Sequence, residues 1–300
     1  MKQQNVSEYK KRFETPEVLE LTKKELESLR NDPLVYPLIH DELKLTNKEA
    51  ELFIASLLDY QDDVHYCAAC PGLEHCEKAH PHFRLRLERE GDFLTRHYDP
   101  CEKMVSLASF KKRYLYCSFP AEWRDEDLRN IERSAASRSE VLKAMVKIVD
   151  GDERWLFLNG NVGSGRSFML ACLANYITNK KGQGAFCDCG TLLNDLKSKS
   201  IEDKEGFDEM MKALSEASIL VLDDFGNEYK TEYVYTSILF PLLSARERAG
   251  LTTCFASDFS IRDIVMMYKE KIGAVRANQF GALLNRRCVK EFDVTGVNLH

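Results

Sequence analysis

Hydrophobic and polar residues in the first 60 positions follow a helical pattern. Apolar residues recur every three or four positions in residues 18–29 and again in residues 52–58, which places them on one face of a helix. Thr46 and Glu49 precede the second stretch with the spacing of a capping box, in which each side chain bonds the backbone N–H of the other residue. The chain is therefore predicted to begin with helices.

From about residue 136 onward, helical patterns alternate with short apolar runs. A continuous apolar run of four to six residues, bounded by polar residues, is typical of a strand buried in a parallel sheet. The strands predicted on this basis are 155–158, 184–189, 218–224 and 252–257, and a last strand is predicted at 289–294. The alternation predicts an α/β fold, a parallel sheet flanked by helices. Pro241 lies inside a predicted helix at 233–248 and indicates a kink or a break there.

A glycine-rich turn connects the first of these strands to a helix. Its eight residues are Gly160, Asn161, Val162, Gly163, Ser164, Gly165, Arg166 and Ser167. Glycines let the backbone curl so that its N–H groups point inward, and the helix N-terminus adds partial positive charge. The pattern predicts a loop that binds the phosphates of ATP, with Ser167 as a ligand of Mg²⁺.

One residue of this loop departs from the usual motif, because Arg166 stands where phosphate loops have lysine. The positive charge opposite the phosphates is kept, but the guanidinium is larger and planar. We expect nucleotide binding to be retained or weakened, and hydrolysis to be slowed more than binding.

Acidic and basic residues follow later elements of the second half. Asp223 and Asp224 end the third predicted strand, the position of a Walker B element, where the first would hold Mg²⁺ and the second would polarise the attacking water. Asp258 ends the next strand and would orient water beside the γ-phosphate. Arg286 and Arg287 end a late helix, where a sensor arginine, or one that acts on a neighbouring subunit, would lie.

Cysteine and histidine residues gather between the two halves. Cys67 and Cys70 form a C-x2-C pair, and zinc prefers four thiolate or imidazole ligands in a tetrahedron. The spacing predicts a structural zinc site. It does not choose the second pair of ligands among Cys76, His80, His82 and Cys101.

Composition narrows the class of protein. The net charge of −6 excludes a chain that is basic throughout, so any nucleic-acid contact would come from local patches. The chain has no apolar run near the roughly 18 residues that span a bilayer, and no secretory signal is visible. Ten cysteines without such a signal suggest reduced thiols, so we expect a cytoplasmic protein. The expected domains are 1–105, a linker at 106–135, and 136–300.

Taken together, these motifs resemble the bacterial replicative helicase loaders of the DnaI and DnaC type and, more distantly, the transposition ATPase IstB. The resemblance covers nearly the whole chain. It is carried by the C-x2-C pair with His80-Pro81 and Pro100-Cys101, by the phosphate loop with residues 168–171, by Leu222-Asp223-Asp224-Phe225-Gly226-Asn227-Glu228, and by residues 255–259.

This resemblance implies an AAA+ P-loop domain preceded by a small, mostly helical zinc-binding domain. The family's zinc ligands correspond to Cys67, Cys70, His80 and Cys101. The resemblance also implies that the first domain binds a hexameric DnaB-type helicase and that the AAA+ domain binds ATP and single-stranded DNA. Other primosome proteins, and further copies of the loader on the helicase, are implied partners, and ATPase activity is expected to be slow. Asp258 departs from the asparagine usual in the family.

Two other functions fit the same motifs. One is a P-loop ATPase that regulates a transposase or recombinase, as IstB does. The other is a degenerate NTPase that acts only as an interaction module. Binding of the replicative helicase separates the first from a loader, and nucleotide titration separates the second.

Overall fold

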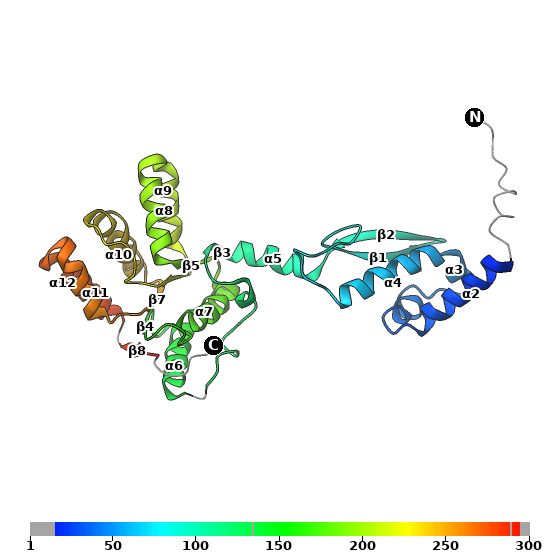
Figure 1. Ribbon diagram of the computed structural model, residues 1–300, viewed down its shortest axis with the longest axis horizontal. Coiled ribbons are helices and arrows are strands. Elements are labelled where there is room, and N and C mark those ends of the chain that lie inside the picture. Colours follow the sequence, from blue (N-terminus) through cyan, green and yellow to red (C-terminus); the bar gives the residue numbers. More distant parts are fainter. Residues whose placement is uncertain (1–15, 134, 289, 295–300) are drawn as a thin grey trace. The chain divides into compact units, whose positions relative to one another are not determined.

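The computed structural model describes residues 16–133, 135–288 and 290–294 (Figure 1). The chain divides between Ala108 and Ser109 into two compact units. Helix α5 (Glu102–Arg113) carries the chain from one unit to the other. None of the described helices is long and apolar enough to cross a membrane.

The first unit packs helices and one β-hairpin around a small apolar core that includes Leu29, Leu57 and Leu85. Thr46 and Glu49 form the predicted capping box: Thr46 N donates to Glu49 Oε2 at 2.8 Å, and Glu49 N donates to Thr46 Oγ1 at 3.4 Å. In chain order the elements are α2 (Pro16–Asn31), η1 (Leu38–Glu42), α3 (Asn47–Leu52), α4 (Ile54–Ala68), β1 (Phe83–Glu90) and β2 (Phe93–Pro100).

The hairpin was not anticipated by the helical expectation for this part of the chain. Strands β1 and β2 pair antiparallel along their whole length, from Phe83 opposite Pro100 to Glu90 opposite Phe93. Gly91 begins the two-residue turn with φ 63°, the left-handed region that such turns require. Leu85 and Leu87 alternate with arginines in β1 and are both buried in the core, so one face of the hairpin completes the first unit.

The second unit contains a six-stranded sheet in which all pairs are parallel, with the order β3-β5-β6-β7-β4-β8. The α/β prediction is therefore confirmed. The strands are β3 (Tyr114–Cys117), β4 (Trp155–Asn159), β5 (Gly184–Asp188), β6 (Ile219–Asp223), β7 (Thr252–Ser257) and β8 (Glu291–Asp293).

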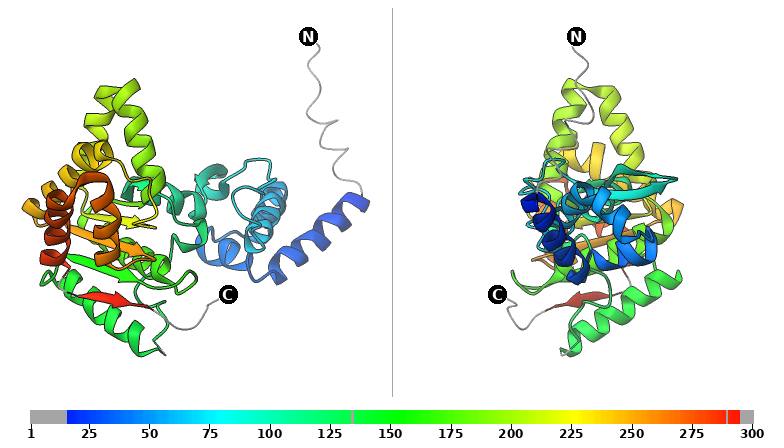
Figure 2. Two further views of the ribbon diagram at one scale, coloured as in Figure 1. Left: turned by 60° about the vertical axis from the view of Figure 1, so that its left-hand side comes forward. Right: turned by 90° about the vertical axis from the view of Figure 1, so that its right-hand side faces the viewer.

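Helices cover both faces of this sheet (Figure 2). Trp155 and Phe157 of β4 belong to one apolar cluster, whereas Leu156 and Leu158 belong to the other. Burial on both faces explains why the strands read as continuous apolar runs. The helices α6 (Ala136–Asp150) and α7 (Arg166–Lys181) supply the second cluster. Those of the first are α8 (Cys189–Glu202), α9 (Lys204–Glu216), η3 (Val234–Leu239), α10 (Phe240–Ala249), α11 (Ile261–Ile272) and α12 (Ala274–Arg287).

Residues 106–135, expected to be a linker, differ from that expectation. Phe110, Tyr114, Phe119 and Ile131 are buried in the apolar cluster of the second unit. Strand β3 pairs with β5 at the edge of the sheet, and the 3₁₀ turn η2 (Ala121–Trp123) follows it. The reason is the aromatic content of the segment, since large rings remove much apolar area from water when they pack.

Pro241 lies where the helix changes its hydrogen-bonding pattern. The preceding turn, η3, is a π-helix, and Pro241 occupies the first turn of α10. Proline has no N–H to donate, and the first turn of a helix is where that loss is tolerated. The helix is therefore not broken at Pro241; helical residues continue from η3 into α10, and only the hydrogen-bonding pattern changes.

Arg246 of α10 is fully buried and faces backbone oxygens. Its guanidinium donates to Leu214 O at 2.6 Å, to Ala217 O at 2.9 Å and to Thr253 Oγ1 at 3.0 Å. Burial lowers its pKa to about 10. The side chain thereby joins α10 to the end of α9 and to β7.

Replacing Arg246 with methionine is expected to lower the free energy of unfolding by about 3 kcal/mol or more, because buried carbonyls lose charge-assisted hydrogen bonds. Denaturant unfolding of the full chain measures this. Arg248→Met is the control, since Arg248 is exposed two positions later on the same helix. Equal stability of the two variants would contradict the structural role of Arg246.

Candidate phosphate-binding site

The glycine-rich loop follows β4 and leads into α7, as the sequence predicted. Gly163 and Gly165 have φ of 81° and 87°, the left-handed region in which glycine is favoured. A Cβ on Gly160 would meet the backbone oxygen of Val294 at 2.8 Å, so this position also requires glycine. Helix α7 begins at Arg166, which directs its N-terminus at the loop.

Three buried polar atoms around the loop have no hydrogen-bond partner. They are Asn159 Oδ1, Ser164 Oγ and Arg166 Nη1, and they make up most of the atoms of this kind in the described part of the chain. A buried polar group without a partner costs about 1–3 kcal/mol. Their concentration at one loop fits a site that receives a polar ligand such as a phosphate.

Ser167 and Asp223 meet beside the loop. Ser167 Oγ at the start of α7 donates to Asp223 Oδ1 at the end of β6, at 2.8 Å. Burial raises the pKa of Asp223, although the hydrogen bond from Ser167 opposes this. A hydroxyl and a carboxylate at this distance are the oxygen ligands that Mg²⁺ takes in phosphate-loop proteins, so the pair fits the implied metal.

Asp224 and Asp258 are brought together by a residue that the sequence analysis did not single out. Asn227 Nδ2 donates to Asp224 Oδ1 at 2.6 Å and to Asp258 Oδ2 at 3.2 Å. Asp224 has φ 55°, a conformation that is uncommon for a residue other than glycine. The signal for Asn227 was its place three residues after Asp224 in the string that carried the family resemblance.

Glu228 stabilises the turn that carries Asp224 and Asn227. Its buried carboxylate accepts from Gly226 N at 2.6 Å and from Tyr268 Oη at 2.8 Å. Burial, together with the nearby Glu228 charge, raises the pKa of Tyr268 well above its ordinary value. Glu228 therefore fixes the backbone that presents Asp224, and it ties this turn to α11.

Arg286 and Arg287 lie apart from this network. Both side chains are largely exposed at the end of α12 and pair with Glu247 of α10, Arg286 Nη1 at 3.3 Å and Arg287 Nε at 3.1 Å. The structure thus keeps them on the surface of the second unit, on the α10 and α12 side of the sheet.

The four predicted zinc ligands do not form a metal site. Within the described ranges, no group of three or more His, Cys, Asp or Glu side chains is arranged so that it could hold a metal ion. Cys67, Cys70, His80 and Cys101 all lie in those ranges, so the zinc prediction finds no support in the structure.

The contacts of these residues give a physical reason. Lys78 Nζ donates to Cys67 Sγ at 3.3 Å and to Phe83 O at 2.6 Å, and it pairs with Asp63 at 2.5 Å. An ammonium group thereby supplies the positive charge beside Cys67. The His80 ring packs instead on the Tyr98 ring, with centroids 4.0 Å apart.

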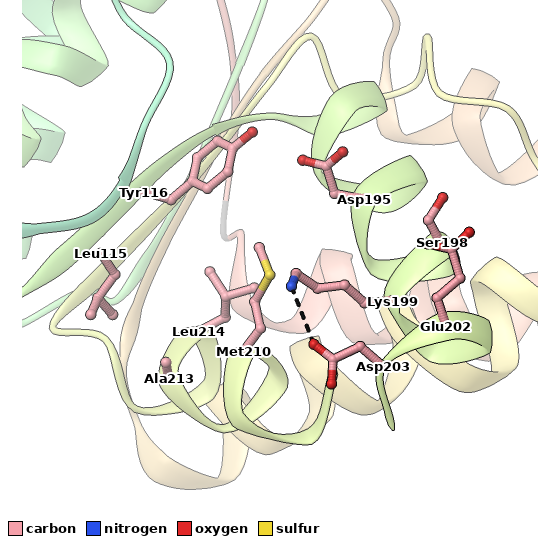
Figure 3. A pocket seen from close by; sticks show the side chains of 10 residues that line it. All are labelled: Leu115, Tyr116, Asp195, Ser198, Lys199, Glu202, Asp203, Met210, Ala213 and Leu214. Carbon is pink, nitrogen blue, oxygen red and sulfur yellow. Dashed lines mark ion pairs between the residues drawn. The ribbon is translucent and has the colours of Figure 1, made fainter. Parts of the chain in front are cut away.

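A hollow of about 590 Å³ lies elsewhere in the second unit, between α8, α9 and β3 (Figure 3). Tyr116, Met210 and Leu214 form its apolar part, and Lys199 pairs with Asp203 at 3.7 Å at its rim. None of the phosphate-loop residues lines it. The hollow is therefore separate from the site described above.

Asp223 is expected to cost stability in the nucleotide-free protein. A carboxyl whose folded pKa is raised lowers stability as pH rises from its unfolded pKa through its folded pKa. Asp223→Asn should therefore raise the unfolding temperature at pH 7 by about 2 °C or more, and this gain should shrink as pH falls toward 4. The same variant should lose stabilisation by Mg²⁺-ATP.

Asp224→Asn, at an exposed position, is the control for the change in unfolding temperature. An Asp223→Asn chain that is less stable than the native chain at pH 7 would contradict the argument.

Comparisons with known proteins show what the chain is similar to. No family model matches the chain. The replicative helicase loader DnaI of Bacillus subtilis (strain 168) is 25% identical over 230 residues, 73% of each chain. A crystal structure of DnaI superposes with a TM-score of 0.54 at 21% identity, over 61% of this chain and 98% of that one. A candidate primosome component from Streptococcus pyogenes serotype M3 gives a TM-score of 0.50 at 25% identity, over 64% and 98%.

The two structures share the fold of the second unit, and the curated relative extends the similarity to nearly three quarters of the sequence. The resemblance predicted from the motifs is confirmed: this chain is similar to the replicative helicase loader DnaI.

Proposed function

We propose that this protein is an ATP-dependent loader of the replicative DNA helicase, which acts when replication starts or restarts. The observation that carries the proposal is the meeting of Ser167 and Asp223 beside a phosphate loop, in a chain similar to a helicase loader. The second unit would bind Mg²⁺-ATP and single-stranded DNA, and the first unit would bind the helicase.

Each side chain of the site has a role in this proposal. Backbone N–H groups of residues 160–167 would hold the phosphates, and Ser167 with Asp223 would hold Mg²⁺. Asp224 would polarise the attacking water, because Asn227 orients its carboxylate by a 2.6 Å hydrogen bond. Asp258 would lie beside the γ-phosphate.

The base would lie near the segment that precedes α6. Trp123 packs edge-on against Phe168, one position after Ser167, with ring centroids 5.5 Å apart. An aromatic pair at the start of α7 supplies apolar surface beside the phosphate loop, as an adenine requires.

The negative charge of the carboxylates near the loop makes ATP binding dependent on magnesium in this proposal. Asp223, Asp224 and Asp258 gather near one cation of the loop, Arg166. Three carboxylates against one guanidinium repel a triphosphate unless a divalent ion accompanies it. ATP binding is therefore proposed to depend on Mg²⁺, and hydrolysis is proposed to be slow, so the protein would act as a switch.

Helicase binding by the first unit can be measured directly. The two parts are separate compact units, and helicase binding is assigned to the first. Immobilised residues 1–108 are therefore expected to retain a hexameric DnaB-type helicase, whereas residues 109–300 alone are not. Phe93→Ser is a useful variant, because this ring is 75% exposed at the start of β2 in the first unit. Retention only by residues 109–300 would contradict the assignment and would favour a regulator of a recombinase.

The exposed arginines of α12 are proposed to act on the ATP site of a neighbouring loader on the helicase. An Arg286→Ala/Arg287→Ala chain is expected to lose ATPase activity in the presence of helicase by about tenfold or more. Mixing it with an Asp224→Asn chain should restore part of the activity, because some sites then receive arginines from one chain and Asp224 from another. No recovery on mixing would contradict action between subunits.

A further inference from the structure

The two residues that depart from the family's motifs are partners in the structure. Arg166 Nη2 lies 2.5 Å from Asp258 Oδ1, although the two positions are 92 residues apart in the chain. Their side chains are 11% and 30% exposed, respectively, so the pair is partly shielded from water. The contact joins the two departures in one side-chain pair.

The second nitrogen of the guanidinium is left for another ligand. Arg166 Nη1 is buried and has no hydrogen-bond partner, whereas Nη2 is bound to Asp258. A guanidinium presents several N–H donors in a rigid planar fork, so it can bind a carboxylate on one side and a phosphate oxygen on the other. A lysine ammonium is a compact point charge, and at this position it would be drawn either to Asp258 or to the phosphate.

The surroundings hold Asp258 in place as a partner for Arg166. Its other oxygen accepts from Asn227, which also binds Asp224. Asp258 therefore cannot turn away from the loop without loss of two hydrogen bonds. If ATP binds as proposed above, the negative charge of Asp258 would face the γ-phosphate, and Arg166 is the cation paired with it.

We propose that Asp258 and Arg166 form one specificity-determining unit, in which arginine is required at the phosphate loop because aspartate stands opposite it. The inference rests on the ATP binding proposed above. Arg166 bridges Asp258 and the triphosphate, and the unit lowers affinity for ATP relative to ADP, because the extra phosphate meets the charge of Asp258.

A double-substitution cycle on the full chain tests this. Mg²⁺-ATP and Mg²⁺-ADP affinities are measured by calorimetry for the native protein, Arg166→Lys, Asp258→Asn and the doubly substituted chain. Arg166→Lys is expected to weaken ATP binding about tenfold when Asp258 is present, and by less than about threefold in a chain that already carries Asp258→Asn. Asp258→Asn alone should raise the affinity for ATP more than that for ADP.

Two further variants test whether the effect depends on a carboxylate at position 258. In an Asp258→Glu chain, Arg166→Lys should still weaken ATP binding, because the carboxylate remains. Asp263→Asn removes a carboxylate that accepts from Ser260 in the cap of α11 and should leave the effect of Arg166→Lys unchanged. Thermal unfolding of each chain confirms that it is folded.

The outcomes distinguish this inference from the proposed function. An equal effect of Arg166→Lys with and without Asp258, in a protein that binds ATP, overturns the inference and leaves the proposed function standing. Failure of the native chain and of every folded variant to bind Mg²⁺-ATP or Mg²⁺-ADP overturns both.

Discussion

Parallel pairing of β6, β7 and β4 is the constraint on which the candidate site depends. Because the strands run in one direction, their carboxyl ends meet at one edge of the sheet, the usual place for ligands in such folds. The phosphate loop leaves β4, Asp223 ends β6, and Asp258 follows β7 directly. A change in the register of one strand would separate Ser167 from Asp223 and Arg166 from Asp258. Because burial of the apolar runs sets that register, these runs also fix the positions of the polar side chains in the site.

The same edge concentrates features that cost free energy in the absence of a ligand. Asp223 is half-buried, Asp224 has a left-handed backbone conformation, and unpartnered polar atoms surround the loop. The rest of the second unit offsets this cost. Apolar clusters on both faces of the sheet stabilise the fold, and the buried, hydrogen-bonded side chains of Arg246 and Glu228 join its elements. This division is typical of a protein whose site is completed by binding.

The strands, the loop and the carboxylates of the site could be predicted because each has a local signal: an apolar run, a glycine pattern or an acidic strand end. The hairpin at 83–100 was not predicted, because its strand signal in β1 is short: only Leu85 and Leu87 alternate with charged residues as buried positions. The sheet position of residues 114–117 was not predictable, since β3 is short and gains its partner only from β5, far along the chain. Nor could spacing reveal that Lys78 lies beside Cys67, or that Arg166 and Asp258 meet.

In the proposed function, nucleotide at this site controls delivery of a replicative helicase to DNA. The direct measurement is the amount of hexameric DnaB-type helicase assembled on closed circular single-stranded DNA, with and without the protein, in ATP or in ADP. We expect assembly to require the protein and to be greater with Mg²⁺-ATP than with Mg²⁺-ADP. Assembly that proceeds equally well without the protein, or that is indifferent to the nucleotide, would contradict it.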